Sequence, residues 1–200
     1  MKYIDFHTHH IPSTENVVAV VDGRDTWGIH PWKSDEAFVV PDLKDKLAIG
    51  ECGLDALRGP ALEVQEQVFL QQIALSEQTE KPLVIHCVRA LDQLLRMRRE
   101  LRPKMPWMLH GFRGKPQQLR SLLDVGFFIS FGFCHNEESL RLCPMEQLVL
   151  ESDEEVLPIA ELYNNVAQVR DVSVPSLCTI MAQNYLRFFR KASLQTQNGL

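Results

Sequence analysis

Side chains that bind metal ions follow the apolar runs of this chain. Five short apolar runs are each followed, within three residues, by a histidine or an acid. In chain order these side chains are His7 and His9, Glu51, His86, His110 and Asp153. Mixed imidazole and carboxylate ligands suit borderline or hard divalent cations such as Zn, Mn or Mg. The pattern therefore predicts a metal site assembled from the ends of several strands.

The number of candidate ligands favours two ions rather than one. His7 and His9 stand two apart, so on a strand they share a face and can reach one cation. One such histidine is more often a packing residue, but six groups are hard to explain as packing because unpaired buried imidazoles and carboxylates are costly. Six ligands are too many for one catalytic ion that keeps an open position. We expect two ions that share a carboxylate and support hydrolysis.

Strand and helix patterns alternate along the chain. Short apolar segments predict strands at 2–6, 17–21, 26–29, 47–50, 83–86, 107–110, 126–131 and 147–151. Apolar residues at helical spacing predict helices at 61–79, 90–101, 116–124, 156–170 and 174–189. This alternation favours an α/β fold with a (β/α) TIM-type barrel, whose chemistry lies at the carboxyl ends of the strands. Residues 22–26 are too few for a crossover helix, so we expect a barrel that is shortened or irregular in its N-terminal units.

The bulk composition is that of a globular protein. Two hundred residues suggest one domain, and we expect it to span 1–190, with 191–200 as a flexible tail. The first residues are too polar for a signal peptide and no run is long enough to span a membrane, so we expect a cytoplasmic protein. The five cysteines form no CxxC pair, which argues against a disulfide framework or zinc finger. Cys52 and Cys87 directly follow two candidate ligands, so we expect them on the packing side of their strands.

Charge is distributed unevenly. Residues 81–120 carry ten Lys or Arg against two acids, and residues 135–161 carry eight acids against one Arg. One interpretation is a solvated helix face, because Leu91, Leu94, Leu95 and Leu101 form an apolar stripe with Arg96, Arg99 and Arg102 outside it. The other is a positive rim that attracts an anionic substrate. The periodicity favours the solvated face.

Several motifs together resemble the TatD family of metal-dependent hydrolases, over about residues 1–190. They are Asp5-Phe6-His7-Thr8-His9, Gly28-Ile29-His30-Pro31, Gly50-Glu51-Cys52-Gly53-Leu54-Asp55, Pro82 to His86, His110 to Gly114, and Glu151-Ser152-Asp153. The resemblance implies a TIM barrel with two divalent ions that hydrolyses phosphodiester bonds, as a DNase does. One ion would be held by His7, His9, Glu51 and Asp153, and the other by Glu51, His86 and His110. Glu51 would bridge the ions, and Asp153 would orient or deprotonate the attacking water.

Other residues of these motifs suggest substrate contacts. We expect His30, Arg89 and Arg113 to contact substrate, because planar guanidinium groups suit phosphate; the alternatives are a loop histidine and solvent-facing arginines. Asp55 is expected to orient a ligating histidine. Trp32 could stack on a base, although a packed or exposed loop residue is the simpler interpretation.

The sequence departs from the family pattern where substrate would bind. Val88 stands where the family usually has Arg, with Arg89 one residue later, and Glu154-Glu155 replace a proline. These acids disfavour a long polyanion. The leading prediction is a phosphodiesterase of the DNase or 3′-5′ exonuclease type, acting on a phosphodiester such as a DNA end. The alternatives are a hydrolase of a small ester, lactone or amide, and a metal-binding homologue without activity. No motif for sequence-specific nucleic-acid recognition is present.

Overall fold

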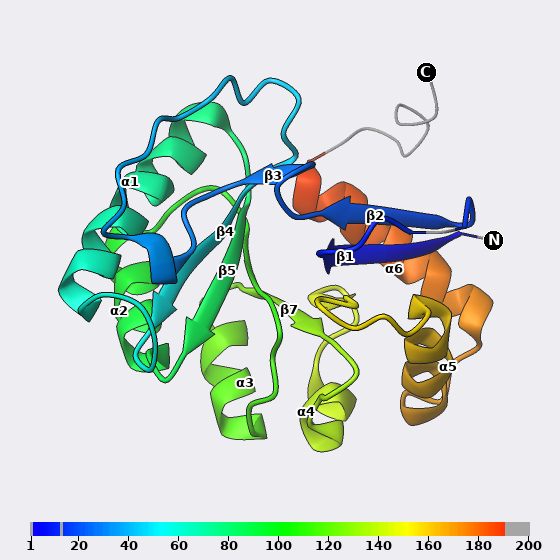
Figure 1. The fold of residues 1–200 in the computed structure, drawn as a ribbon. Coiled ribbons are helices and arrows are strands. Elements are labelled where there is room, and N and C mark those ends of the chain that lie inside the picture. Colours follow the sequence, from blue (N-terminus) through cyan, green and yellow to red (C-terminus); the bar gives the residue numbers. More distant parts are fainter. Residues whose placement is uncertain (1, 13, 191–200) are drawn as a thin grey trace.

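The described part of the chain contains eight strands and six α-helices, which alternate between residues 48 and 169. A computed structural model describes residues 2–12 and 14–190 (Figure 1). The strands are β1 (Tyr3–Thr8), β2 (Val17–Val21), β3 (Thr26–Trp27), β4 (Ala48–Asp55), β5 (Leu83–Val88), β6 (Trp107–Leu109), β7 (Phe128–Phe131) and β8 (Leu148–Leu150). The helices are α1 (Leu62–Thr79), α2 (Leu91–Leu101), α3 (Pro116–Leu123), α4 (Glu137–Leu142), α5 (Ile159–Val169) and α6 (Val174–Phe189), with a 3₁₀ turn η1 (Pro31–Lys33).

The strands form a parallel barrel that closes at one end. β3 to β8 pair in chain order as a six-stranded sheet, and β1 pairs with β2. A parallel bridge between Thr8 and Asp153 joins β1 to the end of β8. The backbone N–H of His9 donates to the carbonyl of Asp153 at 3.0 Å, and the N–H of Asp153 donates to the carbonyl of His7 at 3.0 Å. The predicted (β/α) barrel is confirmed, and its carboxyl end is fixed at this seam.

The N-terminal units lack their helices, as the short spacing predicted. β1 leads to β2 through residues 9–16, and β2 leads to β3 through 22–25. In the described residues before α1, the only helix is the three-residue η1. Figure 1 shows the long segment before β4 passing around the outside of the barrel beside α1. In this N-terminal part of the chain, loops and the short η1 therefore connect the strands in place of α-helices.

The remaining units carry amphipathic helices against the strands. α6 packs on β1 and β8, α5 packs on β1, and α1 packs on β4. The Ser173 hydroxyl caps α6 by accepting the N–H of Ser176, and Arg190 ends the helix in the left-handed conformation. Phe188 of α6 contacts Phe128 edge to face. None of the helices in the described part of the chain is long and apolar enough to span a membrane.

Several element boundaries differ from the prediction. β4 continues to Asp55 instead of ending at 50, and β3 is only two residues long. α4 was not predicted, because its six residues are too few to show a helical period; its start is fixed by the Asn136 side chain, which accepts the N–H of Ser139. Leu101, predicted in the apolar stripe of α2, is 45% exposed, because it lies in the last turn. The predicted tail, 191–200, lies outside the described residues.

The stripe of α2 otherwise packs as its period predicted. Leu94 and Leu95 are buried, while Arg96, Arg99 and Arg102 are exposed, so the solvated-face interpretation holds for these arginines. Cys52, beside the candidate ligand Glu51, is fully buried, and its thiol donates to the Val84 carbonyl.

Candidate metal centre

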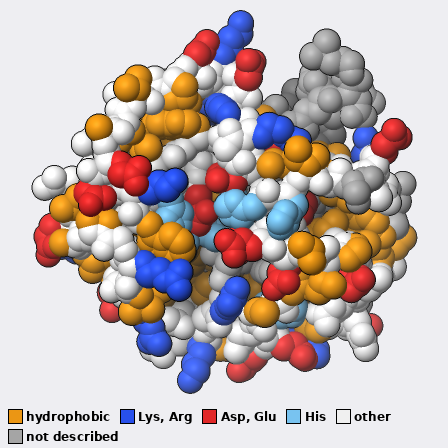
Figure 2. All heavy atoms as spheres, viewed as in Figure 1, with side chains coloured by type: hydrophobic (Ala, Val, Ile, Leu, Met, Phe, Trp, Pro, Cys, Tyr) orange, Lys and Arg blue, Asp and Glu red, His pale blue; other side chains and the backbone are white. Residues whose placement is uncertain are grey.

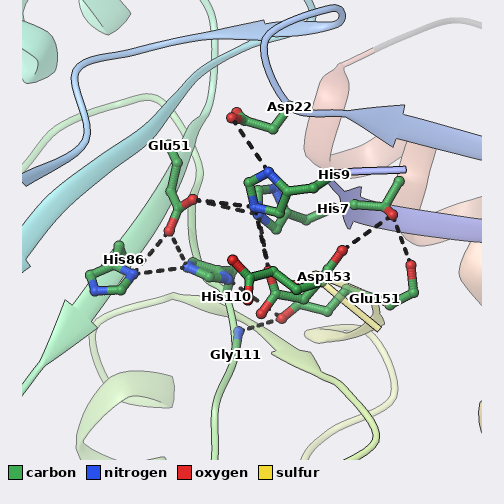
Figure 3. Close-up of polar contacts among 12 residues, drawn as sticks. His7, His9, Asp22, Glu51, His86, His110, Gly111, Glu151 and Asp153 are labelled. Carbon is green, nitrogen blue, oxygen red and sulfur yellow. Dashed lines mark hydrogen bonds and ion pairs between the residues drawn. The ribbon is translucent and has the colours of Figure 1, made fainter. Parts of the chain in front are cut away.

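The six predicted ligands lie together at the carboxyl end of the barrel (Figure 3). They come from five strands that are far apart in the sequence. His7 belongs to β1 and His9 follows it, Glu51 lies in β4, His86 in β5, His110 follows β6, and Asp153 lies beyond β8. Parallel strands bring their carboxyl ends to one face, and this is why the ligands meet.

The first group of ligands surrounds one oxygen of Glu51. Glu51 Oε2 lies 3.7 Å from His7 Nε2 and 3.8 Å from His9 Nε2, and Asp153 Oδ1 lies 3.7 and 3.6 Å from the same two nitrogens. These distances are too long for hydrogen bonds. They suit ligands of one ion, because two atoms each about 2.0–2.2 Å from an ion lie about 3–4 Å apart. His7 is fully buried, and its ring nitrogens have no hydrogen-bond partner among the described residues.

The second group surrounds the other oxygen of Glu51. Glu51 Oε1 lies 2.6 Å from His110 Nε2, 2.9 Å from His86 Nδ1 and 3.4 Å from His30 Nε2. The sequence suggested a substrate or supporting contact for His30, and the structure places its imidazole in this second group. The first group offers two imidazoles and two carboxylates, and the second offers three imidazoles and the shared Glu51 carboxylate. Both donor sets suit a divalent cation.

A carboxylate stands behind the imidazole of His86. Asp55 Oδ2 lies 3.1 Å from His86 Nε2, the nitrogen turned away from Glu51. Asp55 also accepts the indole N–H of Trp32 at 2.6 Å and the backbone N–H of Leu57 at 2.8 Å. A carboxylate that accepts the outer ring N–H fixes the tautomer that presents the other nitrogen to an ion. Asp55 therefore lies in a position to orient a candidate ligand, His86, as expected from the sequence.

Two further carboxylates, Glu151 and Asp22, lie behind ligating histidines as Asp55 does, and neither was predicted from the sequence. Glu151 is fully buried, accepts the backbone N–H of Gly111, and has Oε1 3.6 Å from His110 Nδ1. Asp22 Oδ2 lies 4.0 Å from His9 Nδ1. Glu151 was visible in the sequence as an acid after a strand, but its partner His110 after β6 was not, because the two residues are far apart in the sequence. Asp22 follows β2, so the rule of acids at strand ends could have found it.

Asp5 was quoted in a motif but given no role. Its Oδ2 accepts the Ser152 hydroxyl at 2.6 Å and its Oδ1 accepts the Ser152 N–H at 3.0 Å. The Ser152 hydroxyl also lies 2.9 Å from Thr8 Oγ1. Burial raises the pKa of Asp5 to about 7. The pair ties β1 to the segment that carries Asp153.

Backbone conformation allows these side chains to approach. A Cβ at Gly53 would lie 2.1 Å from the carbonyl oxygen of His86, so only glycine lets β4 and β5 pair this closely beside Glu51. Asp153 adopts φ +57°, the left-handed region that aspartate tolerates better than most residues. Left-handed residues other than glycine are uncommon and concentrate at functional sites.

The charges of the site are strongly perturbed. Burial opposes ionisation of Glu51, but His110, His30 and His86 outweigh it and hold the pKa of this carboxyl well below its usual range. Burial lowers the pKa of His7, which favours the neutral imidazole that binds metal ions. Burial raises the pKa of Asp153. Burial also opposes protonation of His110, but Glu51 and Glu151 outweigh it and raise the pKa of this imidazole. The site therefore combines an ionised central carboxylate with a His7 imidazole that burial keeps neutral.

Two cavities open on the ligands. One has a volume of about 440 Å³ and includes His30 and Trp32 in its walls, and the other, of about 1200 Å³, includes Arg89 and Arg113. His86, His110 and Asp153 line both. Figure 2 shows histidine and acidic side chains at the centre of this face, with lysines and arginines around them.

The two arginines are free to contact a ligand. Arg89 and Arg113 are exposed, and neither forms a hydrogen bond or ion pair with the described residues. The structure thus brings both to the wall of the larger cavity, as expected, but without a fixed orientation.

The comparisons with known proteins agree with this geometry. The chain matches the family described as TatD related DNase over residues 15–190. This chain belongs to that family. The match begins after His7 and His9, which the structure adds to the site. The predicted resemblance is confirmed.

Relatives within the family differ in how much of them is covered. The chain is 35% identical over 146 residues to the 3′-5′ ssDNA/RNA exonuclease TatD of Pantoea ananatis, covering 64% of this chain and 56% of that protein. It is 30% identical over 190 residues to the uncharacterized metal-dependent hydrolase YcfH of Escherichia coli K12, covering 81% and 72%. The chain thus spans little more than half of the first relative.

Solved structures show the same fold. YJJV, a TatD homologue from Escherichia coli K12, superposes with a TM-score of 0.75 at 19% identity, covering 89% of this chain and 78% of that one. A TatD family hydrolase from Entamoeba histolytica gives 0.74 at 16% identity, covering 88% and 76%. At these identities the likeness supports the barrel and not a particular substrate.

Proposed function

We propose that this protein is a two-metal hydrolase of phosphodiester bonds that acts at the end of a single nucleic-acid strand. The observation that carries the proposal is the position of Glu51, whose two oxygens face different sets of ligands. Oε2 faces His7, His9 and Asp153, and Oε1 faces His86, His110 and His30. A carboxylate placed between two such sets is suited to bridging two ions. The two relatives, named as an exonuclease and as a metal-dependent hydrolase, support the same proposal.

Residues in and around the ligand sets would transfer the proton of the attacking water and bind the phosphate. Divalent ions, when bound, would supply a nucleophile at neutral pH and neutralise charge on the phosphate. Asp153 lines both cavities, so its carboxylate would orient the attacking water and accept its proton. Arg89 and Arg113 would hold non-reacting phosphate oxygens with planar, charged donors. His30 lines the smaller cavity and would either join the second ligand set or contact the phosphate.

The test is hydrolysis of bis-p-nitrophenyl phosphate and of a short single-stranded oligonucleotide, with Zn, Mg and Mn supplied one at a time. Glu51→Ala should abolish turnover with every metal, because both ligand sets lose their shared carboxylate. Glu161→Ala on α5 serves as a matched control, because it removes an exposed glutamate that belongs to neither ligand set and to neither cavity wall. Full activity in Glu51→Ala would overturn the proposal.

A second candidate is hydrolysis of a small ester, lactone or amide. Glu154 lines the smaller cavity beside Asp153, and its carboxylate repels a polyanion. A panel of phosphodiesters against p-nitrophenyl acetate and simple lactones separates the two. Metal-dependent turnover of the carboxylic esters alone would favour this candidate. Bound metal without turnover on any substrate would identify a metal-binding homologue.

A further inference from the structure

Trp32 is exposed where a large aromatic side chain would ordinarily be buried. It is the only Trp, Tyr or Phe among the described residues that is classed as exposed, with 42% of its surface accessible. It lines the smaller cavity, together with the half-buried Phe38 and Ile29. An exposed aromatic side chain at the wall of a cavity is a feature of ligand sites more than of ordinary surface.

The indole of Trp32 is held in place rather than free. Its ring N–H donates to Asp55 Oδ2 at 2.6 Å, and its backbone N–H donates to His30 Nδ1 at 3.3 Å. The guanidinium of Arg58 stands 5.0 Å from the ring centre. Gly59 lets the segment lie this close, since a Cβ there would come within 2.8 Å of Trp32 Cα. A pre-positioned aromatic plane loses little conformational entropy when it binds a ligand.

The plane stands beside the second ligand set. The ring centre of Trp32 lies 4.5 Å from that of His30 and 5.9 Å from that of His86. A group stacked on Trp32 is therefore within one nucleotide of a phosphate at the metal centre. The cavity, of about 440 Å³, is within the size range of sites for small ligands. Arg89 and Arg113, which suit phosphate, line the larger cavity. The smaller cavity therefore offers aromatic and apolar side chains, and the larger one offers cationic side chains.

We infer that the smaller cavity is a nucleobase site, in which Trp32 stacks on the base of the terminal nucleotide. The inference rests on the proposed function and names the part of the substrate that the smaller cavity recognises. Stacking on one aromatic plane is tolerant of base identity, because every base has a π face. The site therefore selects for a base over a bare sugar phosphate and discriminates little among the four bases.

Binding of reaction products tests the inference without requiring turnover. Thymidine 5′-monophosphate and 2-deoxyribose 5-phosphate differ only in the base, and their dissociation constants are measured by calorimetry on the metal-loaded protein. The wild type should bind the nucleotide about 5- to 150-fold more tightly, the range typical of stacking on one aromatic ring. Trp32→Ala should remove this difference and leave the affinity for deoxyribose 5-phosphate unchanged.

Two further variants separate stacking from the hydrogen bond to Asp55. Trp32→Phe keeps an aromatic face but loses the N–H, so it should retain most of the preference for the nucleotide. Trp32→Leu keeps apolar bulk without a π face and should lose it; it also replaces Trp32→Ala if that variant does not fold. Val39→Ala, on the same segment and 87% exposed, is the control and should behave as wild type.

The outcomes are distinct from those of the function test. Equal affinities for the two ligands in the wild type, or a preference that survives in Trp32→Ala and Trp32→Leu, would overturn the base site even if phosphodiesters are hydrolysed. A preference lost only in those two variants supports it even if the protein turns over no oligonucleotide.

Discussion

Replacing Asp55 with Asn should weaken one metal site and spare the other. Asp55 Oδ2 lies between two donors, His86 Nε2 at 3.1 Å and Trp32 Nε1 at 2.6 Å. An amide group placed there would donate instead of accept. His86 would then have to accept at Nε2 and carry its proton on Nδ1, the nitrogen that faces Glu51 at 2.9 Å. A protonated Nδ1 cannot bind an ion.

The size of the effect follows from this geometry. Loss of a carboxylate behind a ligating histidine typically costs 10- to 100-fold in metal affinity, which is about 1.4–2.8 kcal/mol. The loss should fall on the site that contains His86. The set of His7, His9 and Asp153 has no contact with Asp55 and should keep its affinity. Isosteric Asn leaves the bonds from Leu57 and Arg58 to Oδ1 in place, so the fold should persist.

Calorimetric titration of metal-free protein with Zn²⁺ measures both sites. Asp22→Asn is the matched control, since Asp22 Oδ2 lies 4.0 Å from His9 Nδ1, beyond hydrogen-bond distance, and should give a smaller loss at the other site. In a His86→Ala background, Asp55→Asn should have no further effect on metal affinity. An equal loss in that background, or unchanged two-site binding in Asp55→Asn, would refute the reasoning.

Three further predictions follow from other parts of the structure. Tyr163→Phe should cost about 1–3 kcal/mol of unfolding free energy in urea titration, because the buried hydroxyl donates to the carbonyl of Ile4 at 2.9 Å and accepts its N–H at 3.0 Å; an unchanged midpoint would contradict this. Zn²⁺ at 100 times its dissociation constant should add about 2.7 kcal/mol of stability to the wild type, and thermal melts of Glu51→Ala should show a clearly smaller gain. At pH 8 a thiol reagent should label exposed Cys134 in the native protein, while Cys143, fully buried and with its pKa raised by burial to about 12, should react only after unfolding, as mass spectrometry would show.

The sequence predicted the barrel and the cluster of candidate ligands because both depend on local patterns. Short apolar runs and the polar residues after them are visible within a few positions, and the pairing of His7 with His9 needs only the period of a strand. Those patterns could not show that β4 continues past Glu51 to Asp55, since Gly53 interrupts the apolar run. The close approach of β4 to β5 that Gly53 permits is a tertiary contact.

The contacts behind the ligands were harder to foresee. Glu151 and His110 lie 41 positions apart, and Asp5 and Ser152 lie 147 apart, so no local period links them. The role of Trp32 was left open for the same reason. Its exposure and its bond to Asp55 depend on how residues 28–47 fold against the turn after β4, and that segment has no periodic pattern.

The seam between β1 and β8 has a consequence for how the protein is made. β1 carries His7 and precedes the other described strands in the chain, but its partners Ser152, Asp153 and Tyr163 are synthesised more than 140 residues later. Contacts of such long sequence separation form late, because the intervening chain must close first. β1 is thus among the last of the described strands to reach its final position, and the first ligand set is completed only after Asp153 has been synthesised. A chain that ends directly before α5 would contain all six candidate ligands and still lack the Tyr163 contact that holds β1.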